Sequence, residues 1–597
     1  MSDRDARVNL ESKLMKSRIS KALGSDPLCL VLLASVVIAT RITTLTQPLV
    51  ERHDFRQTQT AYQTLTLSRG EGSLFHPKLP IFGSPWELPF EFPLFQIIAA
   101  KVHQIFGVSL DAANRGTSLF FFVLCLMPLF YLSRRIMSRG ASFAVLVLFS
   151  FSPFALQWSR ASLIEYCALF FALCYGHQTL KTWDQPSLLN ALMSLVLGVT
   201  SGLVKATTLA PVMMFSAILI LFHLGNPRSV FSNWRRLVCV SGPALASLIA
   251  ARVWTQWADG IRLDNPATSW MSEEKLKPWM YGTLDQRRVI ANWMVIFDRI
   301  NLLLIGRFSL VAVLVIALLV PSVRARVAST LGAALVTISI LFNLYVVHDY
   351  YLVAISALVV MSVGVSIDAV FQASSRSIRT GTAVFLVVLV PLSFTLVSER
   401  NYWTLTYKKF PTPVSELKQL STPEQYAFTS YGGWNPLLLY YAERRGMMLD
   451  PRATTVEQLR QLPDLDRYDF YYGAPDRPEI IQIRGWYLPV ASQTTRIDED
   501  VAAFSLWGLA VGVNEPQNEL FTNKRTVTCD GKYFFPLKKL PADITVKTYS
   551  SGTNSFQFPN GLQIVPVGGQ IKILDQLDAE RFGGLSCTGD GTVTFEW

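Results

Sequence analysis

The stretch that decides the fold reads LCLVLLASVVIATRITTLTQPLVERHDFRQ and runs from Leu28 to Gln57. Residues 28–40 carry no charge, and similar apolar stretches recur along the chain as far as Val397. A helix that crosses a bilayer needs about 20 apolar residues, and many of these stretches supply that length. Half of the 597 residues are hydrophobic and only 16% are charged. These values exclude a disordered chain and predict a protein embedded in a membrane.

The apolar stretches predict about eleven transmembrane helices. They are 28–46, 116–133, 140–157, 162–180, 187–203, 206–224, 236–254, 302–320, 328–347, 350–371 and 379–397. One further stretch, 91–107, is ambiguous. If it does not cross, most Arg and Lys residues of the short loops share one side with the basic N-terminus. The positive-inside rule therefore favours a juxtamembrane helix at 91–107, a cytoplasmic N-terminus and an extracytoplasmic tail.

This topology divides the chain into three parts. Residues 1–27 form a basic cytoplasmic N-terminus, 28–398 a transmembrane module with outer loops at 47–115 and 255–300, and 399–597 an α+β domain. In that domain a strand and a helix are expected between residues 426 and 445, with short strands after residue 541. The net charge of +11 lies largely in the N-terminus and short loops, so it sets topology and indicates no nucleic acid.

Two of the seven cysteines, Cys529 and Cys587, lie in the tail, whereas the other five lie in apolar segments. One pair in an otherwise cysteine-free tail predicts a disulfide and an oxidising compartment. Two unrelated buried thiols remain the alternative.

The first outer loop places a carboxylate, Asp54, soon after the first span. A lipid-borne reactive group emerges from the bilayer at this level, so Asp54 is a candidate general base. The alternative is that Asp54 caps the next helix with Gln57 as its capping partner. Further along, Glu91 lies between two phenylalanines in a proline-rich segment. It either accepts a sugar hydroxyl or begins a helix.

Four cations interrupt apolar segments near their outward ends. They are Arg41, Lys205, Arg252 and Arg307. Charges inside spans are costly and mark a ligand, and a phosphate at that depth needs such partners. Snorkelling to the headgroups is the alternative for each of them.

Two more polar groups fall on the same side. Arg160 and Glu165 either pair with each other or meet a ligand. His348, Asp349 and Tyr350 occupy a turn between two spans, where Asp349 can cap the following helix and the tyrosine is an ordinary interface aromatic.

The motifs together resemble the GT-C glycosyltransferases, specifically the family of bacterial protein mannosyltransferases and the lipid A aminoarabinose transferase. The resemblance rests on His53-Asp54-Phe55-Arg56-Gln57, on Glu91 before Pro93, on Ser159-Arg160 with a following acid, and on His348-Asp349-Tyr350-Tyr351. The tail's Trp434-Asn435-Pro436 resembles outer domains of such enzymes. The resemblance implies a polytopic α-helical GT-C bundle in the bacterial inner membrane.

The resemblance also implies a polyprenyl-phosphate-linked sugar as donor, a lipid, glycan or protein as acceptor, and transfer with inversion. Asp54 is then the catalytic carboxylate and Glu91 a helper near the acceptor. The chain lacks the Lys of the family's Glu-Lys-Pro-Pro run, so Lys205 is the first choice for the donor phosphate. The residues expected to bind substrate are His53, Arg56, Arg160, Glu165, His348, Asp349 and Tyr350.

The sequence leaves open how the phosphate is neutralised, which rival function applies, and whether the chain is an enzyme. Arg or Lys can neutralise the leaving phosphate, or a bound divalent ion can do so, with Asp54 and His53 as its ligands. A polysaccharide polymerase uses the same donors, and a transporter also lines its path with intramembrane charges. A receptor or assembly scaffold with the bundle as anchor is the non-enzymatic alternative.

Overall fold

The computed structural model describes most of the helical part of the chain and less of the tail. Residues 25–224, 233–265, 267–306, 309–373 and 435–448 are described, together with residues 414, 418 and 423 and the strands between residues 426 and 596. The N-terminal segment 1–24, Arg307 and the predicted span 379–397 lie outside the described residues.

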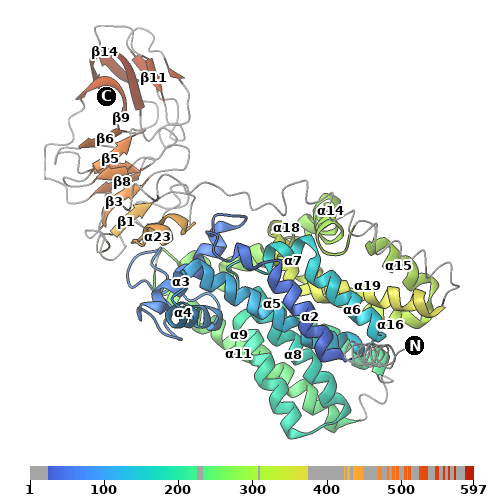
Figure 1. The fold of residues 1–597 in the computed structure, drawn as a ribbon. Coiled ribbons are helices and arrows are strands. Elements are labelled where there is room, and N and C mark those ends of the chain that lie inside the picture. The colour runs from blue at the N-terminus through green and yellow to red at the C-terminus, as the bar shows by residue number, and fades with distance from the viewer. Residues whose placement is uncertain are drawn as a thin grey trace, which may run out of the picture.

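The first part of the chain folds almost wholly into helices (Figure 1). In chain order these are α2 (Asp26–Ala39), α3 (Asp54–Ser68), α4 (Leu94–Phe106), α5 (Leu110–Arg134), α6 (Arg139–Phe151), α7 (Pro153–Trp158), α8 (Glu165–Asp184), α9 (Leu188–Leu219), α11 (Trp234–Asp264), α12 (Glu273–Tyr281), α13 (Leu284–Arg288), α14 (Ile290–Arg299), α15 (Ser309–Leu319), α16 (Arg324–Val327), α17 (Ala333–Ile340), α18 (Phe342–Val347) and α19 (Val353–Ala373). Short 3₁₀ and π turns join several of them: η1 (Ile42–Thr44), η2 (Ile220–Leu224), η3 (Ser269–Met271), η4 (Ile300–Ile305), η5 (Pro321–Val323), η6 (Ala328–Gly332) and η7 (Asp349–Leu352).

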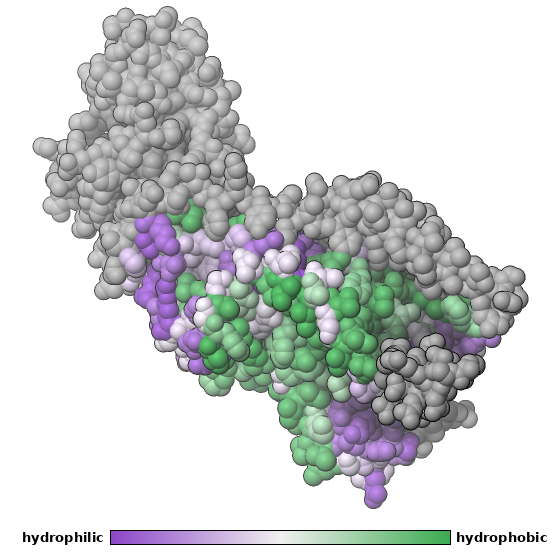
Figure 2. Space-filling model, in the orientation of Figure 1, coloured by the Kyte–Doolittle hydropathy of each residue, from purple (hydrophilic) through white to green (hydrophobic). Residues whose placement is uncertain are grey.

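Among the described residues, six helices are long and apolar enough to cross a membrane. They are Asp26–Thr44, Leu110–Arg134, Leu188–Phe222, Trp234–Asp264, Pro321–Ile340 and Asp349–Gln372. A seventh span arises if Ile290–Ile305 and Ser309–Leu319, which meet at 93°, form one broken helix. Figure 2 shows apolar residues over the helices and hydrophilic residues towards the two ends of the body. The chain is a multi-pass membrane protein.

Part of the difference from the predicted number of spans lies in α9, which joins most of the predicted spans 187–203 and 206–224 into one element. Lys205, inside α9, has extended backbone angles (φ −164°, ψ 96°). Gly198, before this break, packs against Tyr175 of α8, and Gly176 of α8 packs against Val212 after the break. Both arms of α9 therefore pass the same turn of α8, and the chain turns back at Lys205.

The ambiguous stretch 91–107 forms α4, which lies alongside α3. The side-chain amide of Gln96 donates to Gln63 Oε1 (2.9 Å), and that of Gln104 donates to the Ser68 carbonyl (2.7 Å). These contacts join the second half of α3 to α4. The expected helix is therefore present, and with 13 residues it is not among the candidate membrane spans.

The tail contains a short helix and many strands. Its elements are β1 (Tyr426–Thr429), α23 (Leu437–Ala442), β2 (Arg445–Met448), β3 (Tyr468–Tyr472), β4 (Ile480–Gln482), β5 (Tyr487–Val490), β6 (Gln493–Arg496), β7 (Ala503–Leu506), β8 (Leu509–Gly512), β9 (Lys524–Phe534), β10 (Thr545–Tyr549), β11 (Ser555–Gln557), β12 (Gln563–Ile564), β13 (Gln570–Lys572) and β14 (Leu585–Glu596). One sheet has the order β2-β1-β3-β4, with β1 parallel to both β2 and β3. A second has the order β12-β11-β14-β10-β13, with β9 paired to β14.

The predicted disulfide falls on two neighbouring strands. Cys529 lies in β9 and Cys587 in β14, and these strands pair antiparallel. Their side chains lie outside the described residues, so the disulfide remains a prediction.

The tail segment 435–448 packs onto the first outer loop. The backbone amide of Met448, in β2, donates to the carbonyl of Ile81 (2.7 Å), so loop residues 80–83 extend the sheet beyond β2. An apolar core that includes Leu49 and α23 joins the two segments. The loop and the tail segment therefore lie at the same end of the bundle, which we call the loop end (Figure 1).

Candidate functional site

Asp54 is the first residue of α3, and the N-cap position belongs to His53, whose backbone is left-handed (φ 55°) and whose side chain makes no capping bond. The capping alternative holds in part, because Asp54 accepts a first-turn amide, whereas Gln57, the predicted capping partner, donates to the Arg52 carbonyl instead. Asp54 Oδ1 accepts the amide of Phe55 (2.8 Å) and the side-chain amide of Asn435 from the tail (3.3 Å). These two bonds orient the carboxylate at the loop end.

Asp349 is fully buried beneath the start of α3. It accepts from Arg52 Nε and from His53 Nε2, both at 3.0 Å, so it holds the loop before α3. The His53 ring stands edge-on to the Tyr350 ring at 5.1 Å. Burial, followed by the charge of His53, lowers the pKa of His348 to about 4, so His348 is neutral at pH 7. The predicted motif therefore meets the first outer loop in space.

Glu91 pairs with Arg56, one turn into α3. Burial alone raises the pKa of Glu91, but the charges of Arg56 and Lys205 outweigh it and lower the pKa below its ordinary value. Burial likewise opposes the charge of Arg56, and Glu91 raises its pKa. Because α4 begins only at Leu94, Glu91 lies outside the helix. The alternative in which Glu91 merely begins a helix is wrong.

Lys205 lies at the turn between the two arms of α9. Its ammonium group is 2.5 Å from Glu165 Oε1, and both side chains are buried. It also lies over the ring of Tyr351 (4.6 Å) and near that of Tyr350 (5.5 Å). The second oxygen, Glu165 Oε2, is buried with no hydrogen-bond partner in the described part of the chain. The break in α9 thus places a cation among carboxylates at the loop end.

These groups form one cluster. The amide of Phe92 donates to the carbonyl of Leu203 (3.2 Å), which brings the Glu91 segment to the turn at Lys205. Arg56 is close enough to Glu165 and Tyr350 to interact electrostatically with both. We call the following residues the loop-end cluster: His53, Asp54, Arg56, Glu91, Glu165, Lys205, His348, Asp349 and Tyr350.

The other predicted phosphate-binding cations do not join this cluster. Arg41 is buried, with Nε on Ser159 Oγ (2.7 Å) and its remaining nitrogens on carbonyls and a threonine of its surroundings. Arg252 is half exposed and pairs with Glu273. Arg307 lies outside the described residues. The predicted convergence of four cations is therefore wrong for Arg41 and Arg252, and the role of Lys205 in binding phosphate stays a prediction.

One alternative predicted that Arg160 pairs with Glu165. The two residues instead have different partners. Arg160 approaches Glu51 at 3.5 Å, and Glu51 also pairs with Arg115 at 2.7 Å. Arg115 further donates to the carbonyls of residues 47, 48 and 160. This group locks the first outer loop to α5 and the α7–α8 connection, and Arg160 belongs to the lock.

Sequence reasoning missed three residues. Glu51 anchors the lock, Tyr351 lies beneath Lys205, and Asn435 contacts Asp54. Glu51 could have been found from its position three residues before Asp54, and Tyr351 from the motif that contains it. No local signal links Asn435 to Asp54.

A metal ion held by Asp54 and His53 stays a prediction. No group of three His, Cys, Asp or Glu side chains comes together as a metal site among the residues that the structure describes. One ring nitrogen of His53, Nε2, faces Asp349. A metal requirement remains a prediction of the sequence alone.

Comparison with known proteins returns solved structures only. No family model and no curated protein matches the chain. ArnT from Cupriavidus metallidurans bound to undecaprenyl phosphate is 12% identical, with a TM-score of 0.48, over 76% of this chain and 94% of ArnT. AglB, an oligosaccharyltransferase from Archaeoglobus fulgidus in complex with an inhibitory peptide and a dolichol-phosphate, is 11% identical, with a TM-score of 0.46, over 74% and 68%.

A third match is the arabinofuranosyltransferase AftD from Mycobacteria, which is 12% identical with a TM-score of 0.47. It covers 95% of this chain, which spans only 57% of AftD. All three are GT-C glycosyltransferases, the group that the sequence motifs resemble. Because these similarities are so low, we base the function on the residues of this chain.

Proposed function

We propose that this chain is a membrane glycosyltransferase that moves a sugar from a polyprenyl-phosphate donor to an acceptor at the loop end. The observation that carries the proposal is the loop-end cluster. At the loop end, the Arg56–Glu91 pair lies beside the Lys205–Glu165 pair, and Asp54 begins α3 two residues before Arg56. By the positive-inside rule this end lies outside the cytoplasm of a bacterial inner membrane.

Lys205 and Arg56 are the proposed partners of the donor phosphate. A sugar joined to a polyprenyl phosphate already has a good leaving group, so the site needs to neutralise charge rather than donate a proton. Lys205 supplies a buried ammonium, and Arg56 a planar guanidinium able to bind two phosphate oxygens. Without donor, Glu165 and Glu91 balance these cations.

Asp54 is the proposed general base. Its Oδ1 is oriented by Phe55 and Asn435, so the carboxylate keeps a fixed direction at the start of α3. The acceptor hydroxyl gives its proton to Asp54 as the new glycosidic bond forms and the bond to phosphate breaks. A single displacement of this kind inverts the anomeric carbon. Glu91, held by Arg56, is the proposed hydrogen-bond acceptor for a second hydroxyl.

The test uses the product that any such donor must release. The full chain, in vesicles, receives a panel of undecaprenyl-phosphate sugars and cell-envelope acceptors, and free undecaprenyl phosphate is measured. We expect the Asp54→Asn variant to release it at least about 100-fold more slowly than the unchanged chain. The matched control is Asp285→Asn, because Asp285 is an exposed carboxylate on α13.

Two outcomes contradict different parts of the proposal. Full release by the Asp54→Asn variant removes Asp54 as the base. An unchanged chain that releases undecaprenyl phosphate from no donor in the panel removes the glycosyltransferase assignment itself.

A further inference from the structure

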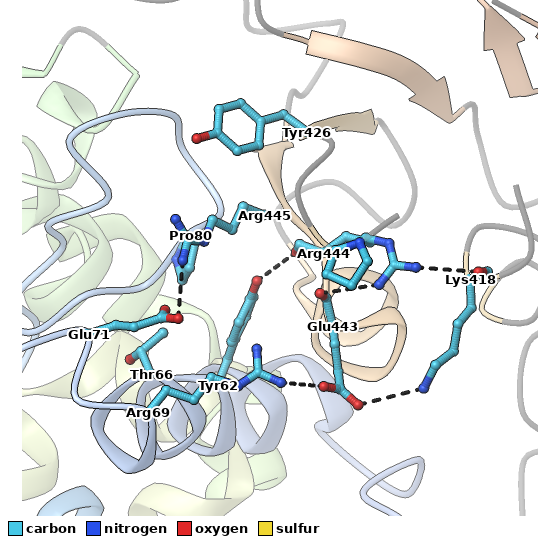
Figure 3. Close-up of a pocket in the computed structure, with 11 residues that line it drawn as sticks. Tyr62, Thr66, Arg69, Glu71, Pro80, Lys418, Tyr426, Glu443, Arg444 and Arg445 are labelled. Carbon is cyan, nitrogen blue, oxygen red and sulfur yellow. Dashed lines mark hydrogen bonds and ion pairs between the residues drawn. The ribbon is translucent and has the colours of Figure 1, made fainter. Parts of the chain in front are cut away.

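A cavity separate from the loop-end cluster lies between α3 and the tail segment (Figure 3). Its volume is about 740 Å³, which is within the usual range for small-molecule sites. One wall comes from α3 and the loop after it, and the other from six tail residues: Lys418, Pro423, Tyr426, Glu443, Arg444 and Arg445. Its size suits a few sugar units and excludes a folded protein.

The cavity carries more positive than negative side chains. The cations are Arg69, Lys418, Arg444 and Arg445, and the carboxylates are Glu71 and Glu443. Glu443 is shared between Arg69 and Lys418, the latter at 3.6 Å, while Arg445 pairs with Glu71 at 3.1 Å. Two carboxylates cannot neutralise four cations, so the cavity attracts an anion.

Two tyrosine rings flank the charged groups. The Tyr62 hydroxyl donates to the Arg444 carbonyl (2.6 Å), which fixes its ring on the α3 side. The Tyr426 ring stands edge-on to Trp86 at 5.0 Å, on the opposite side of the cavity in Figure 3. The Tyr62 ring is buried and forms part of the wall, whereas Tyr426 is partly exposed and can pack on the apolar face of a sugar. The Arg and Glu groups can meet hydroxyls that both donate and accept.

We propose that this cavity binds an anionic carbohydrate. The cavity lies along the same helix as the loop-end cluster. Tyr62 is eight residues after Asp54 on α3, and Arg69 follows the end of that helix. At 1.5 Å per residue these positions lie about 12 Å and about 22 Å from Asp54 along the axis. The carbohydrate is therefore a distal, acidic part of the acceptor glycan. This identification rests on the proposed function, whereas the binding of an anionic carbohydrate to the cavity does not.

The experiment measures binding without any donor. The full chain in detergent micelles is titrated calorimetrically with trigalacturonate and, separately, with neutral maltotriose. We expect trigalacturonate to bind at least tenfold more tightly, and its affinity to fall as salt is added. We expect the double variant Lys418→Gln/Arg445→Gln to weaken trigalacturonate binding at least tenfold.

The matched control removes one Lys and one Arg from exposed pairs elsewhere, in the variant Lys277→Gln/Arg288→Gln. It keeps the affinity of the unchanged chain. Thermal unfolding of both double variants establishes that they are folded. The Asp54→Asn variant binds trigalacturonate normally, which separates a failure of this proposal from a failure of the transferase assignment. Equal affinity for the two sugars, no binding of trigalacturonate, or an equal loss in the control overturns the proposal.

Discussion

The loop end carries ion pairs in two different settings. On the bundle side, Glu165 and Lys205 are 2% and 8% exposed, and Glu51 and Arg115 are 5% and 0% exposed. On the tail side, Lys418 and Glu443 are 54% and 43% exposed. A buried charge loses its hydration and depends on its partner, whereas an exposed one is screened by water. The bundle side therefore has fixed pairs, and the cavity has pairs that a ligand can readily replace.

The largest effect is expected for the lock around Glu51. The Arg115→Ala variant leaves Glu51 buried with only Arg160 nearby at 3.5 Å. Breaking such a buried pair lowers the free energy of unfolding by about 3–5 kcal/mol. Denaturant unfolding in micelles measures it, with Arg288→Ala as the exposed control expected within about 1 kcal/mol of the unchanged chain. Equal stability of the two variants would contradict the distinction between buried and exposed ion pairs.

A second effect, on donor binding, is expected at Lys205, in addition to the stability that is lost when Glu165 is left buried and unpaired. The Lys205→Ala variant binds undecaprenyl phosphate about 10–100-fold more weakly, because one charge-assisted bond worth about 1.5–3 kcal/mol is lost. Its affinity for trigalacturonate does not change. The double variant Lys205→Met/Glu165→Gln removes the unpaired carboxylate and so regains stability, but not donor binding. Unchanged donor affinity in both variants would exclude Lys205 from the phosphate site.

The fold was more predictable than the site. Long apolar stretches are a local signal, so a multi-pass helical chain and a helix within 91–107 followed from the sequence, whereas the number of spans did not. The tail segment lies beside the first outer loop, as predicted. The residue types at Asp54, Glu91 and Lys205 were also visible, because a charge beside or inside an apolar stretch is conspicuous.

Partners across the chain could not be predicted in the same way. Glu165 joins Lys205 and Asp349 joins Arg52 and His53 only because of how the helices pack. Arg41 looks the same as Lys205 in the sequence, yet it is bound to Ser159 and to backbone carbonyls. No pattern in one sequence distinguishes these two cations, since the difference lies in long-range contacts.

A pH effect is expected from His348, whose ring contacts His53 and Tyr350 on the bundle side. Burial, then the charge of His53, lowers its pKa to about 4 from the ordinary 6.5; Asp349 opposes the shift, and Arg299 and Lys205 add to it. Between pH 6.5 and pH 4 the unfolded chain therefore takes up a proton that the folded chain does not, so stability falls as pH falls. The His348→Gln variant should lose less unfolding temperature between pH 7.5 and pH 5 than the unchanged chain. An identical loss would show that His348 does not titrate in this way.

The smallest effect on stability is expected in the cavity. The Lys418→Gln variant removes an exposed partner of Glu443, and the free energy of unfolding changes by about 1 kcal/mol or less. Denaturant unfolding of this variant beside Arg115→Ala compares the two settings in one experiment. A loss as large as that of Arg115→Ala would mean that the cavity is a structural lock and not an open site.

The central claim is that the loop-end cluster is the donor site. The most direct measurement is an experimental structure of the full chain with undecaprenyl phosphate bound. We expect the phosphate within hydrogen-bonding distance of Lys205 Nζ and Arg56, at the same end of the bundle as Asp54. A phosphate bound at the opposite end, beside Arg326 and Asp368, would contradict the account.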